Sequence, residues 1–298
     1  MTTEVPPEQR SRGATLRAAV AERRALLVPG AADALAARII EDLGFEVVYL
    51  SGAGLANAAF GVPDLGLVTL TETANAASAI AEVCALPLIV DADTGFGNPL
   101  NLIRAVRLLE RAGANALQIE DQIFPKRCGH FDGKAVIPPG DMVMKIKAAV
   151  DSRVSPDLLI IARTDARAVE GLAGAIERAQ AYVEAGADVT FVEAPATIEE
   201  MGSITTSISA PQVANMVVGG RTPLLPASTL REMGFSLVLY ANAALQASVH
   251  AMREVLGALR EDGSVERVSD RLASFELRQE IVKKAAWDRL DAKYRDDV

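Results

Sequence analysis

Eight short apolar runs, each followed by a stretch with helical character, constrain the fold of this chain more than any other feature. The runs are residues 26–29, 47–50, 88–91, 117–120, 159–162, 189–192, 212–215 and 237–240. Short strands that alternate with amphipathic helices indicate βαβ units and a parallel sheet. Eight such units favour a closed barrel over an open sheet, and 298 residues suffice for one. The sequence therefore predicts a (β/α)8 TIM barrel.

The helix ends support one domain. Four predicted helices end in the same short sequence pattern before the next strand. Each pattern contains a glycine that is typical of a helix C-cap: Gly44, Gly113, Gly186 and Gly234. No Ser/Gly-rich or Pro-rich linker interrupts residues 25–245. We expect a single domain over residues 1–298, with a polar start at 1–13. A charged helical extension, 262–298, is expected to pack outside the barrel or on a partner subunit.

Charge and cysteine content exclude several classes of protein. The formal charge is −9, and no Lys/Arg cluster exceeds short runs such as Arg23-Arg24, which argues against nucleic acids and membrane surfaces as partners. No apolar run approaches the roughly 20 residues of a membrane span. The two cysteines imply no disulfide framework, and Cys84 in its apolar run is expected to be structural. We therefore expect a cytoplasmic protein that acts on a small molecule.

Polar residues follow the apolar runs at the points where the predicted strands end. Asp91 and Asp93 are two residues apart on one strand and point the same way, and Glu120 ends the next strand. Barrel enzymes place their chemistry at this end of the strands. Three converging carboxylates predict a hard cation such as Mg²⁺. The alternative is that they pair with Arg163 and Lys126 for structural reasons alone.

Cys128 lies in a different setting from Cys84. Lys126, Arg127 and His130 flank it in a proline-containing loop, residues 122–139. Neighbouring cations lower a thiol pKa and make the group available for proton transfer. A Cys/His nucleophile fits less well, because His130 is only two residues away on a flexible loop. We therefore interpret Cys128 as an acid/base group.

These residues fall in motifs of a known family. Over about residues 20–260 the chain resembles the isocitrate lyase/phosphoenolpyruvate mutase superfamily. The matching motifs are Tyr49-Leu50-Ser51-Gly52, Gly61-Val62-Pro63-Asp64, Asp91-Ala92-Asp93-Thr94-Gly95-Phe96-Gly97, Ile119-Glu120-Asp121-Gln122, Lys126-Arg127-Cys128-Gly129-His130, Ala162-Arg163-Thr164-Asp165-Ala166 and Asn215-Met216-Val217. The resemblance implies a barrel with its last helix swapped between subunits, and a homotetramer built as a dimer of dimers.

The same resemblance assigns roles to individual residues. It implies a metal ion, Mg²⁺ or else Mn²⁺, near Asp91, Asp93 and Glu120. Asp64 is expected to lie behind these three carboxylates. Substrate-binding residues are expected to be Ser51, Gly52, Ala53, Gly129, Glu193 and Asn215, of which Ser51, Gly52 and Ala53 hold a pyruvate- or glyoxylate-like unit. The catalytic set is expected to be Cys128, Arg163, His130 and Lys126, with Arg163 neutralising an oxyanion.

The loop around Cys128 resembles that of the lyase branch, the 2-methylisocitrate and 2,3-dimethylmalate lyases. The expected reaction splits a substituted 2-hydroxy diacid into a 2-oxo acid and a carbanion that Cys128 protonates. Carboxyphosphonoenolpyruvate mutase-like enzymes share this loop, so that chemistry stays open. Oxaloacetate decarboxylase or hydrolase activity also stays open, as does binding of a 2-oxo acid without turnover.

Two positions depart from the lyase pattern. Val218 stands where dimethylmalate-type lyases have a glutamate. Tyr240-Ala241-Asn242-Ala243 departs from the Tyr-Pro-Leu pattern of methylisocitrate lyases. Both changes point away from methylisocitrate. An apolar wall at Val218 would suit an alkyl substituent or a smaller diacid.

Overall fold

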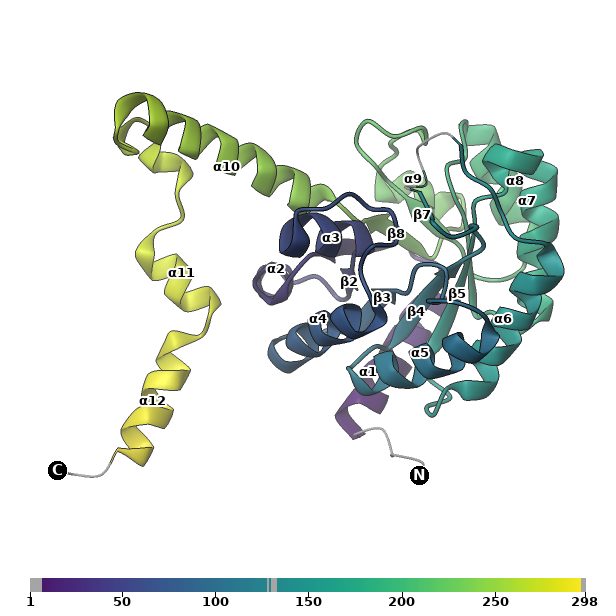
Figure 1. Cartoon of the computed structure of the whole chain (residues 1–298), viewed down its shortest axis with the longest axis horizontal. Helices are drawn as coiled ribbons and strands as arrows, with labels where there is room; N and C mark the ends of the chain where they lie inside the picture. The colour runs from purple at the N-terminus through teal and green to yellow at the C-terminus, as the bar shows by residue number, and fades with distance from the viewer. Residues whose placement is uncertain (1–6, 128, 130–132, 296–298) are drawn as a thin grey trace.

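The computed structural model of the chain describes residues 7–127, 129 and 133–295. Eight parallel strands form its centre: β1 (Leu26–Ala31), β2 (Val48–Leu50), β3 (Leu88–Asp91), β4 (Ala116–Glu120), β5 (Leu159–Thr164), β6 (Val189–Val192), β7 (Val213–Asn215) and β8 (Leu237–Tyr240). Their order is β6-β5-β4-β3-β2-β1-β8-β7, and a parallel bridge between Thr190 and Gln212 joins the two ends. The predicted (β/α)8 barrel is confirmed (Figure 1).

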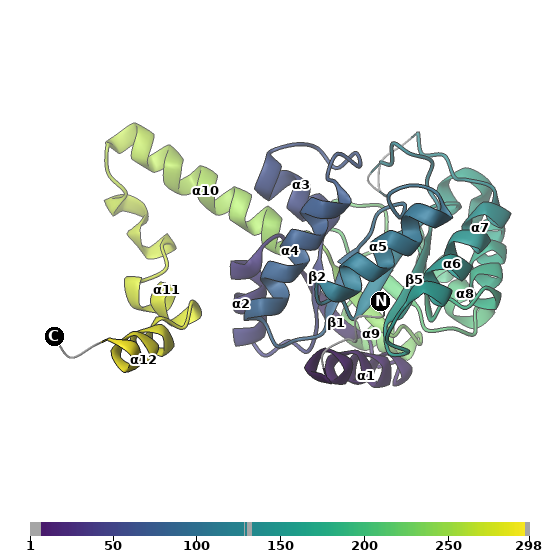
Figure 2. The same ribbon diagram turned by 60° about the horizontal axis from the view of Figure 1, so that its bottom comes forward.

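Helices connect successive strands and cover the outside of the barrel (Figures 1 and 2). They are α2 (Ala34–Asp42), α3 (Gly52–Phe60), α4 (Leu70–Val83), α5 (Pro99–Arg111), α6 (Pro139–Ser152), α7 (Arg167–Glu184), α8 (Ile198–Ser207) and α9 (Ala227–Glu232). Several begin at side chains that accept hydrogen bonds from the first turn. Thr69 and Glu72 form a reciprocal capping box at α4, and Asn98 caps α5 just before Pro99.

The core has two layers, inside the strands and between strands and helices. Tyr49, Ile89 and Phe191 fill the barrel interior, and the outer faces of the strands pack on the helices. Helix α1 (Pro7–Ala21) crosses the amino-terminal end of the barrel and buries Leu16 and Val20 against the interior cluster. Because α1 closes that end, the carboxyl ends of the strands form the accessible mouth.

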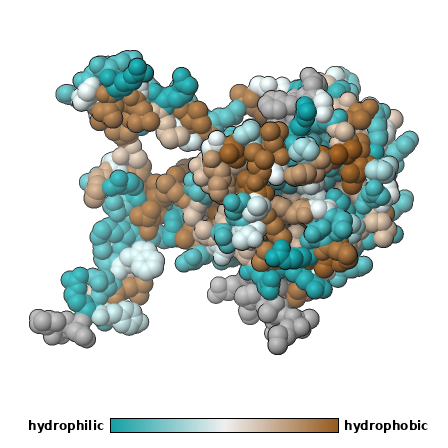
Figure 3. All heavy atoms as spheres, viewed as in Figure 1, coloured by the Kyte–Doolittle hydropathy of each residue, from teal (hydrophilic) through white to brown (hydrophobic). Residues whose placement is uncertain are grey.

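The chain after β8 leaves the barrel. Helix α10 (Ala243–Asp262) projects outward and is followed by η1 (Glu266–Arg271), α11 (Phe275–Ile281) and α12 (Lys284–Tyr294), which form an arm beside the barrel (Figures 1 and 2). Large apolar side chains of this arm are exposed, among them Met252, Leu256, Phe275 and Trp287. Figure 3 shows exposed hydrophobic residues as brown patches on α10 and on the barrel surface that faces it.

Among the described residues, no helix has the length and apolar character that crossing a membrane requires.

Candidate active site at the barrel mouth

A chamber of about 50 Å³ lies at the mouth of the barrel. Predicted site residues from most of the strand ends line it: Ser51, Ala53, Asp64, Asp91, Lys126, Gly129, Arg163, Glu193 and Asn215. Gly52, Asp93 and Glu120 contact members of this set directly. Cys128 and His130 lie outside the described residues. The structure thus brings the described candidates together, while their chemical roles stay predictions.

Asp91, at the end of β3, is held by three N–H donors. Its Oδ1 accepts hydrogen bonds from the Asp93 backbone at 3.1 Å and from Gln118 Nε2 at 3.2 Å. Its Oδ2 accepts from Gly52 N at 3.3 Å. Gln118 is itself fixed from the barrel interior, because Tyr49 donates its hydroxyl to Gln118 Oε1 at 2.9 Å. The Asp91 carboxylate therefore has a defined orientation toward the chamber.

Lys126 places an ammonium group between two other carboxylates. Its Nζ lies 2.8 Å from Asp93 Oδ1 and also pairs with Asp64, and the side chain is only 4% exposed. Burial raises the pKa of Asp93 to about 6; Lys126 opposes the rise, whereas Asp91 and Asp64 add to it. Burial would lower the pKa of Lys126, but these carboxylates and Glu120 raise it well above its usual value. Lys126 therefore stays charged.

Glu120, at the end of β4, is buried with incomplete compensation of its charge. Its Oε2 lies 3.5 Å from Arg163 Nε, whereas its Oε1 is buried and accepts no hydrogen bond from the residues that the structure describes. Burial raises the pKa of Glu120 well above its usual value, against the attraction of Arg163 and Lys126. A buried oxygen without a partner is costly unless another group satisfies it.

The oxygen donors at the mouth fit a hard cation that keeps most of its water ligands. The described residues include no ready-made cluster of three or more His, Cys, Asp or Glu side chains arranged around a metal. However, Mg²⁺ commonly uses only one or two carboxylates together with waters and substrate. Glu120 Oε1 and the neighbouring Asp91 and Asp93 provide such oxygens. If the carboxylates served only the fold, Lys126 would be expected to pair with them, and it does pair with Asp64 and Asp93. However, it does not donate a hydrogen bond to Glu120 Oε1.

Arg163, at the end of β5, is the cation on the opposite side of the carboxylates. Asp165 accepts hydrogen bonds from its Nε at 2.9 Å and from its Nη2 at 3.1 Å. Glu120 and Glu193 lie 3.5 and 3.7 Å from Nε, and the guanidinium stacks 5.2 Å from the ring centre of Phe191. This two-point contact fixes the plane of the guanidinium, as bidentate pairs do.

The amino-terminal end of α3 supplies backbone donors at the mouth. Ser51 caps this helix: its Oγ accepts from Gly54 N at 3.0 Å and lies 3.0 Å from Asn242 Oδ1, to which it donates. A Cβ added to Gly52 would lie 3.0 Å from Asp91 Oδ2, so a larger residue here would push that carboxylate aside. The N–H groups at a helix start favour anions. Because Gly52 N and Gly54 N already donate to Asp91 and Ser51, Ala53 N is the donor that this end of α3 can offer to a carboxylate.

Glu193 and Asn215 form the far wall of the chamber, with Asn215 Nδ2 3.3 Å from Glu193 Oε2. From the segment after β7, Val217 lines the chamber, whereas Val218 is absent from the lining and is 59% exposed. The expected apolar wall at Val218 is therefore wrong for this structure, because its side chain points to solvent. Asn242, at the other departure, does line the chamber.

The loop after β4 reaches the chamber at Gly129. A Cβ added there would lie 2.6 Å from Glu193 Cγ and would also meet Arg163, so the backbone rests directly on both side chains. Lys134 binds the Gly129 carbonyl and also contacts Asp165 Oδ1 at 3.0 Å. Gly129 and Arg163 are therefore connected through Lys134 and Asp165.

Asp165 and Lys134 are functional candidates that the sequence patterns did not indicate. Asp165 is fully buried, and Arg163 and Lys134 lower its pKa against the effect of burial. The i, i+2 spacing of Arg163 and Asp165 on a strand end was an available signal, since such residues point the same way. No comparable pattern marks Lys134.

Comparisons with known proteins identify the family of the chain. Residues 16–260 match the family model described as phosphoenolpyruvate phosphomutase. The chain is 45% identical to 2,3-dimethylmalate lyase of Eubacterium barkeri, covering 88% of this chain and 91% of the relative. It is 44% identical to 2-methylisocitrate lyase of Aeropyrum pernix, covering 94% and 90%.

A solved structure shows the same likeness in three dimensions. Oxaloacetate acetylhydrolase, in complex with the inhibitor 3,3-difluorooxalacetate, superposes with a TM-score of 0.90 at 32% identity. The match covers 96% of this chain and 99% of the other.

Proposed function

The chain belongs to the phosphoenolpyruvate mutase/isocitrate lyase superfamily, and from this premise we propose that it is a Mg²⁺-dependent lyase acting on a substituted 2-hydroxy diacid. The products would be a 2-oxo acid, pyruvate or glyoxylate, and a carboxylic acid. The named relatives are lyases, and they confirm the prediction of a carbon–carbon lyase. The exact substrate and the metal belong to the proposal.

The observation that carries the proposal is the convergence of three features on one chamber. They are carboxylates that suit a hard cation, the oriented guanidinium of Arg163, and the first turn of α3, whose Ala53 lines the chamber. Together they suit a substrate with one carboxylate and a neighbouring oxygen that becomes negative during the reaction. Preorganised charges of this kind often make the largest contribution to catalysis.

The chain's own residues would divide the work as follows. The N–H group of Ala53, at the start of α3, would hold the carboxylate of the future 2-oxo acid, and Mg²⁺, when bound, would supply Lewis-acid polarisation of the adjacent oxygen. When the C2–C3 bond breaks, the C2 hydroxyl passes its proton to a carboxylate that lines the chamber and becomes a carbonyl. Arg163 neutralises the negative charge that develops on the C2 oxygen. The electron pair of the broken bond stays on C3, where the adjacent carboxylate stabilises it. Cys128 then protonates C3.

The direct test is a substrate panel. The protein with Mg²⁺ would be incubated with alkylmalates and alkylcitrates, and release of pyruvate or glyoxylate would be followed by a coupled dehydrogenase. We expect release from at least one member and loss of release with excess EDTA. A panel without any 2-oxo acid product would refute the proposal.

A second candidate is hydrolysis or decarboxylation of oxaloacetate, which the likeness to oxaloacetate acetylhydrolase favours. Cys128→Ser separates the lyase reaction from metal-assisted decarboxylation, whereas hydrolysis is identified by its products, oxalate and acetate. Loss of a general acid should reduce lyase turnover by roughly 10²-fold or more, whereas metal-assisted decarboxylation needs no such acid. Turnover of oxaloacetate that survives in the variant, without activity on alkylmalates, would favour the second candidate. Phosphonate chemistry is tested by adding carboxyphosphonoenolpyruvate to the panel.

We also propose that the protein works in the cytoplasm as a homotetramer whose C-terminal helices are exchanged within dimers. Support comes from the exposed apolar arm and from a groove of about 400 Å³ beside the base of α10, where Leu35, Ile39 and Leu43 are exposed. Burial of both surfaces in one interface would be favourable. Light scattering after gel filtration measures the oligomeric state.

A further inference from the structure

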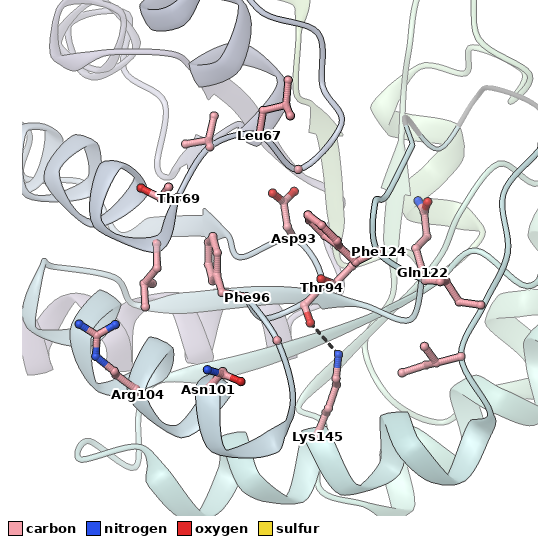
Figure 4. Close-up of a pocket in the computed structure, with 16 residues that line it drawn as sticks. Leu67, Thr69, Asp93, Thr94, Phe96, Asn101, Arg104, Gln122, Phe124 and Lys145 are labelled. Atoms are coloured by element: carbon pink, nitrogen blue, oxygen red, sulfur yellow. Dashed lines mark hydrogen bonds between the residues drawn. The ribbon is translucent and has the colours of Figure 1, made fainter.

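A second and larger cavity lies outside the barrel mouth. Its volume is about 560 Å³, and among the residues that the structure describes, none lines both this cavity and the chamber. It is bounded by the segment before α4, the β3–α5 connection, the segment after β4 and helix α6 (Figure 4). A pocket of this size is typical of sites for small organic ligands.

The walls of this side pocket are mainly apolar. Side chains from four separate segments form them: Leu67, Leu70, Phe96, Ile123, Phe124 and Ile137. Leu67, Ile123 and Phe124 are substantially exposed to solvent. Such a surface would lose contact with water if an alkyl chain filled the pocket, which is favourable.

A single buried ammonium group faces this apolar space. Lys145, on α6, points into the pocket, and its Nζ donates to the Thr94 carbonyl at 2.9 Å (Figure 4). Its side chain is buried, and within the described part of the chain it has no carboxylate within salt-bridge distance. Burial lowers the pKa of Lys145, against the attraction of Asp141 one turn away. Two of its three donor positions remain for another partner.

Buried ammonium groups are normally paired, because an isolated charge away from water is costly. Among the described residues, the other charged groups that line the pocket do not provide that partner. Arg104 is exposed at the rim and carries the same charge, and Asp93 directs its Oδ1 to Lys126. An anion on the ligand would complete the site, and the mainly apolar walls favour a ligand whose remainder is a hydrocarbon chain.

We propose that this side pocket binds an aliphatic monocarboxylate, with its carboxylate on Lys145 and its alkyl chain between Phe96 and Ile137. The site is separate from the chamber and does not depend on the proposed reaction. It shares the β3–α5 connection with the mouth, since Lys145 holds the residue next to Asp93. A ligand here would lie beside the carboxylates of the active site without entering it.

The test uses isothermal titration calorimetry on the full chain with butyrate, hexanoate and octanoate, and with 1-hexanol as the uncharged control. Each added methylene should strengthen binding about fourfold until the pocket is full. Hexanoate should bind at least about tenfold more tightly than 1-hexanol, because a hydrogen-bonded charge contributes to one ligand only. Binding should persist in excess oxalate with Mg²⁺, which is expected to occupy the mouth.

Substitutions locate the site. Lys145→Met keeps the aliphatic stem and should weaken hexanoate binding about tenfold or more, whereas Lys147→Met, at an exposed position of the same helix, should leave it unchanged. If Lys145→Met fails to fold, the comparison of hexanoate with 1-hexanol on the native protein decides instead, and equal affinity for the two would overturn the proposal. Equal affinity in both methionine variants, displacement of hexanoate by oxalate, or absence of binding by every acid would overturn the proposal.

Discussion

Asp165→Asn tests how the site holds Arg163. The substitution keeps the shape of the side chain but removes the negative charge that two buried cations share. In the native protein, Asp165 accepts two hydrogen bonds from Arg163 and contacts Lys134 at 3.0 Å, and it has no exposed surface. Breaking a buried ion pair by removing one partner typically costs about 3–5 kcal/mol.

The structure places the expected loss near the lower end of that range. The asparagine keeps one carbonyl acceptor, and Arg163 retains Glu120 and Glu193 at 3.5 and 3.7 Å. We therefore expect the free energy of unfolding to fall by about 3 kcal/mol. The guanidinium loses its fixed plane, so kcat should fall by roughly 10²-fold, as when one preorganised donor is removed.

The assay combines urea unfolding with release of the 2-oxo acid. Asp151→Asn, at an exposed position, is the matched control and should change stability by no more than about 0.5 kcal/mol. Because the folded protein lowers the pKa of Asp165, its charge stabilises the fold above the unfolded pKa of about 4. The difference between the native protein and Asp165→Asn should therefore shrink as pH falls below about 4. Native stability and kcat in Asp165→Asn would refute the reasoning.

Three further outcomes follow from the geometry of the mouth and the arm. Gly52→Ala should reduce kcat/KM by about tenfold or more, since its Cβ would crowd Asp91 Oδ2 at 3.0 Å; circular dichroism should show an intact fold. Mg²⁺ affinity, measured by calorimetry, should weaken as pH falls through about 6, because protonated Asp93 is a poor ligand; constant affinity from pH 5 to 8 would contradict this. Leu256→Glu, on the exposed face of α10, should lower the oligomeric mass in light scattering, and an unchanged mass would exclude this face from the interface.

The barrel and the position of its site could be predicted from the sequence because both depend on local patterns. Alternating apolar runs and helices specify the strands, and the carboxyl ends of parallel strands meet at one mouth whatever the details of the loops. Asp91, Glu120, Arg163, Glu193 and Asn215 each end a run or follow it directly, so their convergence needed no knowledge of packing.

Contacts made by loops could not be predicted in this way. Neither Val217 nor Val218 belongs to a strand or helix, so no periodicity fixes which of them faces the chamber, and the prediction chose the exposed one. Ser51 meets Asn242 across 191 positions of sequence, a contact that exists only because β1 lies between β2 and β8 in the closed sheet.

Lys134 illustrates a physical reason why contacts made by loops could not be predicted from the sequence. A lysine in a polar loop is expected to remain in water, since burying its charge is costly without a partner. Its side chain is buried here because Asp165 and the Gly129 carbonyl both lie within reach. That environment exists only after β5 has placed Asp165 beneath the loop. The same interaction fixes Arg163, so the stability of this contact and the orientation of the proposed oxyanion-binding group should change together.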